Sequence, residues 1–366
     1  MDYFDIASIF ECMDAARYYG QEDIRVEDVE PDTVGPNEVR IDVEACGICG
    51  SDLHEYTAGP IFVPGDDPHP VSDVQAPLTM GHEFSGTISE VGSDVADLSE
   101  GDAVAVNPII YCGECPRCEA GEYHRCESLG FVGLASNGGF AENAVVDAEK
   151  AIPLGDIPVE HGALIEPLAV ALHATRVADV SAGDSVAVFG SGPIGLCQIQ
   201  TLRAAGAGPI IVSEPRDQRR ARADRCGADV LVDPTEEDPL DVIRAETGEG
   251  VDVAFDVAGV EATYNQAING TRPGGRVAEV SIFEAGVETN PNDLVIPERS
   301  LVGSIAYQGG PRSGEEFGMV IDMLEDGQLD PDPLITDRVD LDEIVDGGFE
   351  RLLDPDSDQV KILVKP

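Results

Sequence analysis

Four cysteines occur close together in the polar segment CGECPRCEAGEYHRC, at positions Cys112, Cys115, Cys118 and Cys126. Four thiolates at such short spacing can fill every position around a tetrahedral zinc ion and leave none open, as in structural zinc sites. The polar, glycine- and proline-containing segment argues against the alternative that these cysteines serve only for packing. The spacing therefore predicts a structural zinc ion that holds a loop with little hydrophobic core of its own.

A second set of possible metal ligands is spread over the segments CGICGSDLHE, GHEFSG and IEPLAVALHA. A catalytic zinc needs three protein ligands and one open position for water or a substrate oxygen. Cys49, His82 and Glu166 satisfy that count. Glu83 either lies behind the metal or exchanges with Glu166 as a ligand, and the sequence does not decide between these alternatives. Asp52 is predicted to accept a hydrogen bond that orients the His82 ring.

Two of these assignments have simpler alternatives. Cys46 resembles Cys49 and could be the ligand in its place, although its position at the start of CGIC favours packing. Glu166 could be an acidic residue in the first turn of a helix, where the helix dipole favours negative charge. The ligand count favours a metal role for Glu166, with Glu83 as the alternative.

A glycine-rich turn, VAVFGSGPIGL, follows an apolar strand and begins a helix. Gly190, Gly192 and Gly195 have the GxGxxG spacing of dinucleotide-binding folds. The first glycine permits a tight turn, the second lets backbone amides approach pyrophosphate, and the third lets the helix pack on the strand. With Pro193 and Ile194 at the start of the helix, the loop predicts a phosphate site at the helix N-terminus.

Glu214 ends the next predicted strand, IIVSE, where an acidic residue can accept hydrogen bonds from the adenosine ribose hydroxyls. This position predicts NAD rather than NADP, because a 2′-phosphate would face the carboxylate. Arg216 and Arg219 lie nearby in the sequence and could weaken that preference. The alternative for Glu214 is a solvated acid at a strand end, which is common in so acidic a chain.

The elements that must position these residues follow two patterns. Residues 13–30 are predicted to be a pair of strands with a turn at Gly20. Residues 35–150 contain short alternating segments separated by Gly, Pro and Asp, with no helical period, which predicts a β-rich, barrel-like structure. From about residue 166, apolar strands alternate with helices, which predicts a parallel, doubly wound sheet.

The last part of the chain, 306–366, contains a predicted helix at GEEFGMVIDMLEDG and a final strand at VKILVKP, and it could pack back on the first domain. A chain of 366 residues is long enough for two hydrophobic cores. We therefore predict an α/β protein with one domain at 13–165, completed by 306–366, and a dinucleotide-binding domain at 166–305. Residues 1–12 are predicted to be an N-terminal extension.

The charge of the chain is extreme: Asp and Glu number 71 against 22 Lys and Arg, for a net charge of -49, and only three lysines occur. At ~1 M salt the screening length falls to about 3 Å, which makes such an acidic surface tolerable. We therefore expect a salt-accumulating, halophilic host. The same charge argues against nucleic-acid and anionic-membrane partners, because these require clustered Lys or Arg.

Membrane and export signals are not found in the sequence. No run approaches the ~18 apolar residues that a membrane helix needs, and the N-terminus does not follow the pattern of a signal peptide. Nine cysteines then favour metal binding or packing over disulfides. These observations predict a soluble cytoplasmic protein.

The motifs CGICGSDLHE, GHEFSG, the four-cysteine loop and the glycine loop at Gly190 occur in the order typical of the zinc-dependent medium-chain alcohol dehydrogenase family, which the chain resembles over 13–366. Within that family, the segment before GHEFSG, the IEPLAV and GSIAY stretches and the C-terminal end look most like the (R,R)-2,3-butanediol dehydrogenases. Sorbitol and threonine dehydrogenases come next.

This resemblance implies a GroES-like catalytic domain built from both chain ends around an inserted Rossmann domain, with substrate in the cleft between them. It also implies that Ser51 and His54 are catalytic. Ser51 would pass the alcohol proton through the cofactor ribose toward His54, which would release it to solvent. Members of the family form dimers or tetramers by pairing their nucleotide domains, so a homo-oligomer is expected.

We therefore predict a zinc-dependent NAD(H) oxidoreductase that interconverts a secondary alcohol or vicinal diol and its ketone, with 2,3-butanediol and acetoin as the expected pair. The alternatives within the same class are a polyol or sugar dehydrogenase and an L-threonine 3-dehydrogenase. An alternative from a different class is a non-catalytic nucleotide-binding relative. Such a protein would keep the glycine loop but would have no need for Cys49, His82 and Ser51 together.

Overall fold

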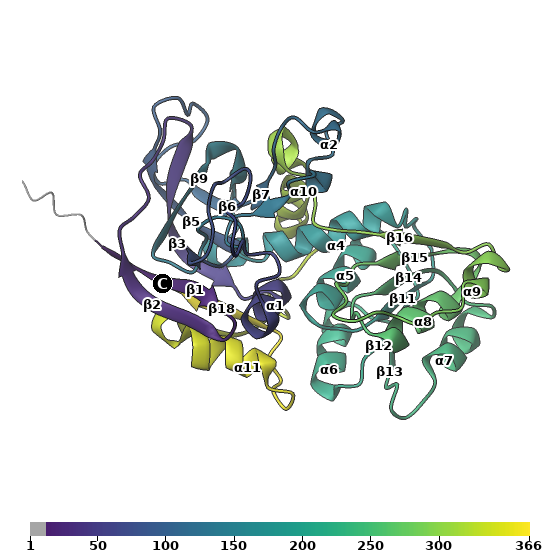
Figure 1. Ribbon diagram of the computed structural model, residues 1–366. Helices are drawn as coiled ribbons and strands as arrows, with labels where there is room; N and C mark the ends of the chain where they lie inside the picture. The colour runs from purple at the N-terminus through teal and green to yellow at the C-terminus, as the bar shows by residue number, and fades with distance from the viewer. Residues whose placement is uncertain (1–11) are drawn as a thin grey trace, which may run out of the picture.

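A computed structural model describes residues 12–366, so the predicted extension at 1–12 lies outside the described residues except for Cys12. A β-rich half lies beside a half in which strands and helices alternate (Figure 1). These two halves match the predicted fold class of a GroES-like part and a doubly wound sheet. Within 12–366, no helix is long and apolar enough to cross a membrane.

The β-rich half contains two main sheets. The strands of these two sheets are β1 (Met13–Gly20), β2 (Asp23–Val29), β3 (Glu38–Gly47), β4 (Leu78–Thr79), β5 (Glu83–Val91), β6 (Ala103–Val106), β9 (Asn143–Asp147), β10 (Ala151–Pro153), β17 (Ile335–Asp340) and β18 (Lys361–Lys365). One sheet has the order β2-β1-β4, and β1 and β2 form the hairpin predicted around Gly20. The larger sheet has the order β10-β6-β5-β3-β18-β17, with β9 also paired to β3.

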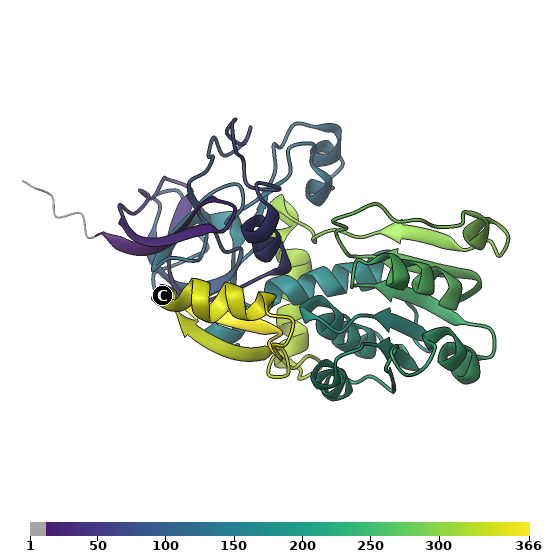
Figure 2. The same ribbon diagram turned by 60° about the horizontal axis from the view of Figure 1, so that its bottom comes forward.

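The C-terminal segment returns to this half of the molecule. Strand β18 pairs antiparallel with β3 and parallel with β17, and its apolar residues are buried. Figure 2 shows this segment, in yellow, against the purple N-terminal strands. The tail therefore packs on the β-rich half, and strand β3 brings it next to the residues around Cys49.

The expectation that no helix interrupts 35–150 is wrong. Helix α1 (Gly50–Ala58) follows β3 directly, and the short helix α2 (Pro116–Glu119) lies in the four-cysteine segment. Only Leu53 and Tyr56 supply large apolar side chains to α1, so it has almost no apolar period. Its start is fixed instead by a cap, because the Asp52 side chain accepts a hydrogen bond from the backbone N–H of Cys49.

The second half is built around a six-stranded sheet with the order β13-β12-β11-β14-β15-β16, in which all neighbouring strands are parallel. The strands are β11 (Val186–Phe189), β12 (Ile210–Ser213), β13 (Val230–Val232), β14 (Val251–Asp256), β15 (Thr271–Glu279) and β16 (Ser300–Gly303). Central strands such as VAVF and IIVS are buried along their whole length, because helices cover both faces of such a sheet. The connecting helices are α5 (Pro193–Ala204), α6 (Asp217–Cys226), α7 (Pro239–Thr247) and α8 (Glu261–Gly270).

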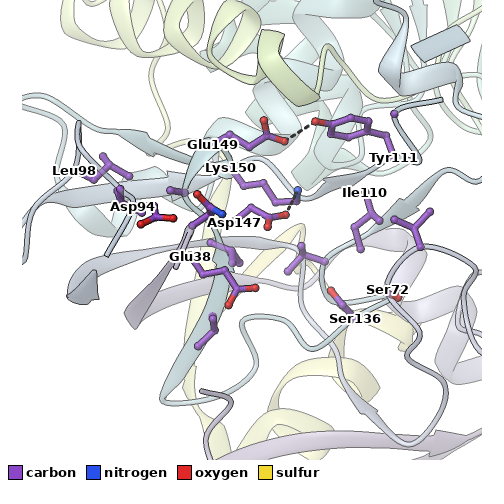
Figure 3. A pocket seen from close by; sticks show the side chains of 18 of the residues that line it. Glu38, Ser72, Asp94, Leu98, Ile110, Tyr111, Ser136, Asp147, Glu149 and Lys150 are labelled. Carbon is purple, nitrogen blue, oxygen red and sulfur yellow. Dashed lines mark hydrogen bonds and ion pairs between the residues drawn. The ribbon is translucent and has the colours of Figure 1, made fainter. Parts of the chain in front are cut away.

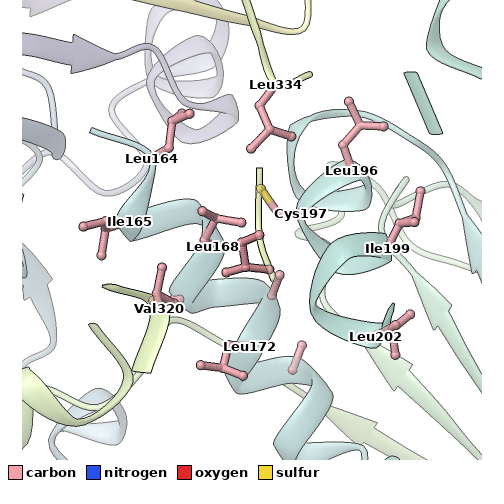
Figure 4. Close-up of a cluster of buried hydrophobic side chains, with 14 of the residues drawn as sticks. Leu164, Ile165, Leu168, Leu172, Leu196, Cys197, Ile199, Leu202, Val320 and Leu334 are labelled. Carbon is pink, nitrogen blue, oxygen red and sulfur yellow. The ribbon is translucent and has the colours of Figure 1, made fainter. Parts of the chain in front are cut away.

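Helix α4 (Ile165–Val177) joins the two halves. It packs against α5 on one side and against α10 (Ser313–Glu325), the helix predicted in the tail, on the other. Figure 4 shows the buried side chains of this joint, which include Leu164, Leu168, Leu172, Leu196, Ile199, Leu202 and Val320. Because each such side chain stabilises the fold by about 1.5–3 kcal/mol on burial, the first turn of α4, which carries Glu166, is firmly placed.

Candidate metal and cofactor site

The start of α1 carries three of the predicted site residues: Cys49, Ser51 and His54. Cys49 is the N-cap residue, and its backbone N–H lies 2.9 Å from Asp52 Oδ2. Asp52 is completely buried, so this cap is shielded from water. Ser51 and His54 follow within the first turns and are three residues apart, which puts them on the same face of the helix.

His82 lies opposite Cys49, immediately before β5. It follows Gly81, which has a φ of 94°, and a Cβ at position 81 would come 2.7 Å from the Cys46 sulfur. Only glycine therefore fits this turn. His82 Nε2 lies 3.3 Å from Ser51 Oγ, and its Nδ1 lies 3.4 Å from Asp52 Oδ1.

Cys49, His82 and Glu83 each offer a ligand atom within 4.8 Å of the others. Burial lowers the pKa of His82, but the Asp52 carboxylate and the Cys49 thiolate raise it, and the net result is a pKa well above the ordinary value. Asp52 Oδ1 and His82 Nδ1 are buried and have no other hydrogen-bond partner. A thiolate, an imidazole and a carboxylate are the donors that zinc prefers, and this set fits that ion.

Glu83 is also bound by a lysine that the sequence analysis did not consider. Lys361 Nζ, from β18, lies 2.6 and 2.7 Å from the two Glu83 oxygens and donates to the Ile48 carbonyl at 3.0 Å. Both side chains are buried, and a side chain at Gly47 would collide with the Glu83 carboxylate. The signal in the sequence was that two of the three lysines stand at the ends of the apolar segment ILV in the strand KILVK.

Glu166 lies near this group but does not join it. Its Oε1 accepts a hydrogen bond from Tyr307 Oη at 2.6 Å, and both side chains are buried. Burial raises the pKa of Glu166 to about 7, and the charges of His82 and Glu83 act on it as well. Among the described residues, Glu83 rather than Glu166 completes the group with Cys49 and His82. Tyr307 is a site residue that the sequence analysis missed.

The four cysteines of the predicted structural site come together around α2. Cys112, Cys115, Cys118 and Cys126 each offer a sulfur within 4.8 Å of the others. Backbone N–H groups point at these sulfurs, as shown by Cys112 N and Ser128 N, which lie 3.2 and 3.3 Å from Cys126 Sγ. Such donors, from Glu127 and Cys118, also lower the pKa of Cys115 to about 6. Burial instead raises the pKa of Cys118 to about 12 and also raises that of Cys126. The arrangement of the four sulfurs is what fits a closed tetrahedral metal site.

Replacing Cys118 by Ser is expected to remove one of the two predicted zinc ions and to destabilise the four-cysteine loop. At a zinc concentration a thousand times the dissociation constant, losing the bound ion costs about 4 kcal/mol of stability. Metal analysis and hydrogen exchange of residues 112–126 would measure both effects. Cys226→Ser, which changes a buried thiol outside the cluster, is the control. Equal zinc content in the two variants would contradict the assignment.

The glycine loop has the close contacts that its spacing predicts. Gly190 has a φ of 99°, and a Cβ there would lie 3.0 Å from the Ala258 side chain. A Cβ at Gly195 would collide with the Gly190 carbonyl oxygen, and Gly192 is the N-cap residue of α5. Pro193 occupies the first turn of the helix, followed by Ile194. These contacts leave Gly192 at the N-terminus of α5, where backbone N–H groups can bind an anion.

Glu214 follows β12 and faces the same loop. Its Oε2 accepts hydrogen bonds from the Ser191 backbone N–H at 2.9 Å and from the Ser191 hydroxyl at 3.2 Å, and its side chain is buried. The Arg219 guanidinium lies 3.8 Å from the position of a Cβ at Gly192. The predicted cofactor residues therefore lie close together at the carboxyl ends of β11 and β12, the edge of such a sheet where a dinucleotide can bind.

His54 contacts the second half of the molecule. Its Nδ1 lies 3.2 Å from Glu284 Oε1, in the segment after β15, and the His54 side chain is 32% exposed. His54 is therefore in part open to solvent, as is the half-buried Ser51 on the same helix. Glu284 is a further residue that the sequence analysis did not identify.

A separate groove of about 980 Å³ lies on the β-rich half (Figure 3). Tyr111 donates to Glu149 at 2.8 Å, and Lys150 pairs with Asp147 at 2.8 Å along its wall. None of Cys49, His82 and Glu166 lines it. The groove is therefore separate from the site described above.

Comparison with known proteins matches both halves of the chain. The alcohol dehydrogenase GroES-like domain matches residues 35–156, and the zinc-binding dehydrogenase family matches residues 193–326. The (R,R)-butanediol dehydrogenase of Bacillus subtilis is 46% identical over 97% of this chain and 100% of its own. The L-threonine 3-dehydrogenase of Thermococcus kodakarensis is 37% identical over 87% of this chain and 88% of its own.

Solved structures agree with this comparison. The crystal structure of 2R,3R-butanediol dehydrogenase from Bacillus subtilis superimposes with a TM-score of 0.90 at 45% identity, covering 97% of this chain and 99% of that one. A zinc-binding dehydrogenase from Sinorhizobium meliloti, solved with NADP bound, has a TM-score of 0.86 at 33% identity, with the same coverage. The whole fold, and not one half alone, is shared.

Proposed function

Because the chain belongs to the zinc-binding alcohol dehydrogenase family and is therefore an oxidoreductase, we propose that it interconverts 2,3-butanediol and acetoin with NAD(H). The observation that carries the proposal is the group formed by Cys49, His82 and Glu83 at the start of α1, with Glu166 and Tyr307 beside it. The relatives named for butanediol support the substrate, since one of them aligns over its whole length.

The residues of the site have distinct roles in this proposal. When bound, zinc supplies a Lewis acid that makes an alcohol proton easier to remove, and NAD supplies a hydride acceptor. Cys49 and His82 hold the metal, and Asp52 fixes the His82 ring. Ser51, whose Oγ lies 3.3 Å from His82 Nε2, accepts the alcohol proton, and His54 passes it to solvent.

The third metal ligand is Glu83 or Glu166. Glu83 is the closer to Cys49 and His82, but Lys361 neutralises it. Glu166, with its pKa of about 7, holds a proton over part of the neutral range and can donate a hydrogen bond to the second hydroxyl of a diol. This contact would favour a vicinal diol over a simple alcohol.

The proposal is tested by NAD-linked and NADP-linked assays in multimolar salt, with (R,R)-butanediol, meso-butanediol, sorbitol, glucose and L-threonine, with and without a chelator. Chelator-sensitive turnover of a butanediol, well above the other substrates, is the expected result. Preferred turnover of sorbitol, glucose or L-threonine would keep the zinc chemistry but overturn the butanediol assignment. No turnover by zinc-loaded protein would support a non-catalytic nucleotide-binding role.

NAD is proposed as the preferred cofactor because of Glu214. Its buried carboxylate lies against the glycine loop, where it would repel a 2′-phosphate. The Arg219 guanidinium beside Gly192 opposes this effect, and the relative from Sinorhizobium meliloti was solved with NADP. The NADP arm of the assay measures the balance between the two charges.

We also propose a homo-oligomer that pairs its dinucleotide-binding halves. Strand β16 is an edge strand of the six-stranded sheet. Exposed apolar side chains gather on and around it: Leu301 at 38%, Ile305 at 46%, Val295 at 70% and Ile296 at 78% exposed. Exposed apolar side chains gathered at a sheet edge are usually covered by a partner.

Replacing Leu301 by Asp is therefore expected to shift the protein from an oligomer to a monomer, because a charge at the edge opposes pairing. Analytical ultracentrifugation in multimolar salt measures the change. Leu353→Asp, at a position that is also 38% exposed but lies in the β-rich half, is the matched control. The same mass for wild type and Leu301→Asp would contradict this interface.

The acidic composition supports a cytoplasm of high salt as the place of function. With a net charge of -49, the folded chain repels itself strongly at low ionic strength. The free energy of unfolding is expected to rise between ~0.1 M and ~3 M KCl, because the screening length falls from about 10 Å to below 3 Å. Urea unfolding at each salt concentration measures this, and a flat or falling dependence would contradict the proposal.

A further inference from the structure

Two carboxylates end neighbouring strands of the parallel sheet. Asp256 is the last residue of β14, Glu279 is the last residue of β15, and the strand register places them opposite each other. Asp256 is completely buried. Residues that are paired across two neighbouring strands point to the same face of the sheet. The side chains of Asp256 and Glu279 are therefore neighbours.

In each carboxylate, one oxygen accepts hydrogen bonds and the other accepts none within the described part of the chain; the second is called the bare oxygen. Asp256 Oδ1 accepts hydrogen bonds from the backbone N–H groups of Ala258 and Gly259, at 3.0 and 3.3 Å, and Glu279 Oε1 accepts from the Ser281 N–H at 3.0 Å. Asp256 Oδ2 and Glu279 Oε2 are buried and have no donor among the described residues. The strand register therefore puts the two carboxylates side by side, and each acts on the pKa of the other.

The surroundings supply no positive charge. From α8, Thr263 and the titratable Tyr264 face the pair, and after β16 Ser304 donates its backbone N–H to the Glu279 carbonyl while its hydroxyl is buried without a partner. None of the groups that act most strongly on either carboxylate is a cation. Two bare carboxylate oxygens cannot stay buried side by side without neutralisation.

A shared proton satisfies this geometry better than a metal ion. A proton on Glu279 donates to Asp256 and serves both bare oxygens at once. Ions such as Ca²⁺ or Mg²⁺ require about six or more oxygen ligands, and here only two carboxylate oxygens and one hydroxyl are free. Burial, followed by the charge of Asp256, raises the pKa of Glu279 to about 8, and burial raises the pKa of Asp256 as well.

The pair lies beside the glycine loop, because Asp256 is in register with Phe189, the residue before Gly190. The strand order reverses between β11 and β14, and a dinucleotide binds across such a reversal at the carboxyl ends of the strands. Ala258, two residues after Asp256, packs against Gly190. Glu214 marks the adenosine side, beyond β12, so the nicotinamide half falls on the side of β14 and β15.

We propose that the Asp256–Glu279 pair holds one proton near neutral pH and releases it when the oxidised cofactor binds, and so sets the balance between NAD⁺ and NADH affinity. This inference rests on the proposed NAD(H) function. The nicotinamide ring is positively charged in NAD⁺ and neutral in NADH, so only NAD⁺ favours the doubly ionised pair. In the balanced step, the protonated pair and NAD⁺ give the ionised pair with NAD⁺ bound, and the proton passes to the buffer.

Linkage fixes the sign of the pH dependence. Because NAD⁺ favours the deprotonated pair, its affinity rises as the pH increases through about 8, whereas NADH affinity does not gain in this way. If the bound cation lowers the pKa by about one unit, the ratio of NADH to NAD⁺ dissociation constants changes by up to about tenfold across that range.

Isothermal titration calorimetry in two buffers of different ionisation enthalpy, at pH 7 and pH 9, tests the inference on the zinc-loaded protein. We expect wild type to release more protons on NAD⁺ binding at pH 7 than Glu279→Gln does. We also expect the ratio of the NADH to the NAD⁺ dissociation constant to depend less on pH in that variant. Its change between pH 7 and pH 9 should be about 3–10-fold smaller than in wild type. Glu288→Gln, which changes an exposed carboxylate of the following segment, should behave as wild type. Zinc-site groups and His54 are unchanged in both variants, so their protons cancel in the comparison.

Several outcomes would overturn the inference. Equal proton release by wild type and Glu279→Gln on NAD⁺ binding would do so. An equal fall in proton release in Glu279→Gln and in the control Glu288→Gln would also do so. If the ratio of the NADH to the NAD⁺ dissociation constant changes with the K⁺ concentration and not with the pH, a cation neutralises the pair instead of a proton. Should Glu279→Gln fail to fold, Asp256→Asn removes the same charge. If no variant, nor wild type, binds either nucleotide, the proposed function fails as well, whereas nucleotide binding without the proton difference overturns this inference alone.

Discussion

Replacing Cys49 by alanine is expected to lower kcat/KM by roughly 10³-fold or more and to reduce the zinc content from two ions per chain to one. The thiolate of Cys49 is one of three donors that meet within 4.8 Å, and two donors do not hold zinc firmly. The Lewis acid contributes several kcal/mol to the reaction, and each 1.36 kcal/mol is a factor of ten in rate. Steady-state kinetics and metal analysis measure the two effects together.

The matched control is Cys46→Ala. Cys46 is completely buried next to Gly81 and is the alternative ligand suggested by the CGIC motif. This variant should retain two zinc ions and most of the activity, with a modest loss of stability from the small cavity. If Cys46→Ala loses the metal and Cys49→Ala keeps it, the ligand assignment is reversed.

Replacing Lys361 by methionine is expected to destabilise the metal-free protein by about 3–5 kcal/mol, because it leaves the Glu83 carboxylate buried and without a counter-charge. Urea unfolding in the presence of a chelator measures this loss. The double variant Glu83→Gln/Lys361→Met removes the charge on both sides and should recover most of the stability. Equal stabilities of the single and double variants would contradict the role of this ion pair.

The single variant Lys361→Met also distinguishes Glu83 from Glu166 as the third zinc ligand. If zinc binds Glu83 directly, the ion replaces the missing lysine charge, and added zinc should restore the stability of Lys361→Met. If Glu166 is the ligand, zinc should stabilise Lys361→Met no more than it stabilises wild type. The difference in unfolding free energy with and without zinc, compared between the two proteins, therefore reports on the third ligand.

Local sequence patterns predicted the parts of this molecule that are themselves local. The glycine loop, the hairpin at Gly20, the four-cysteine segment and the alternation of strands and helices each depend on residues close in the chain. Helix α1 was not predicted, because its start depends on a single side chain, Asp52, and its apolar period is weak. A pattern search looks for repeated apolar spacing and does not register such a cap.

The partners of the site carboxylates could not be predicted for a different reason. Lys361 and Tyr307 meet Glu83 and Glu166 across 278 and 141 positions of the chain, so only the completed topology brings them together. The choice between the two glutamates depends on those contacts, and the sequence therefore left it open. Glu284 reaches His54 in the same way, from the segment after β15.

The pairing of β18 with β3 has a consequence for the order of synthesis. The strand that leads into Cys49 is made early, but Lys361, the cation that balances Glu83, belongs to β18, which is made after both halves of the molecule. The dinucleotide-binding half lies between them in the chain and can fold as a unit before the tail appears. A nascent or truncated chain that lacks β18 can therefore hold the glycine loop and the four-cysteine loop while Glu83 still has no counter-charge, so we expect hydride transfer only after β18 has joined β3.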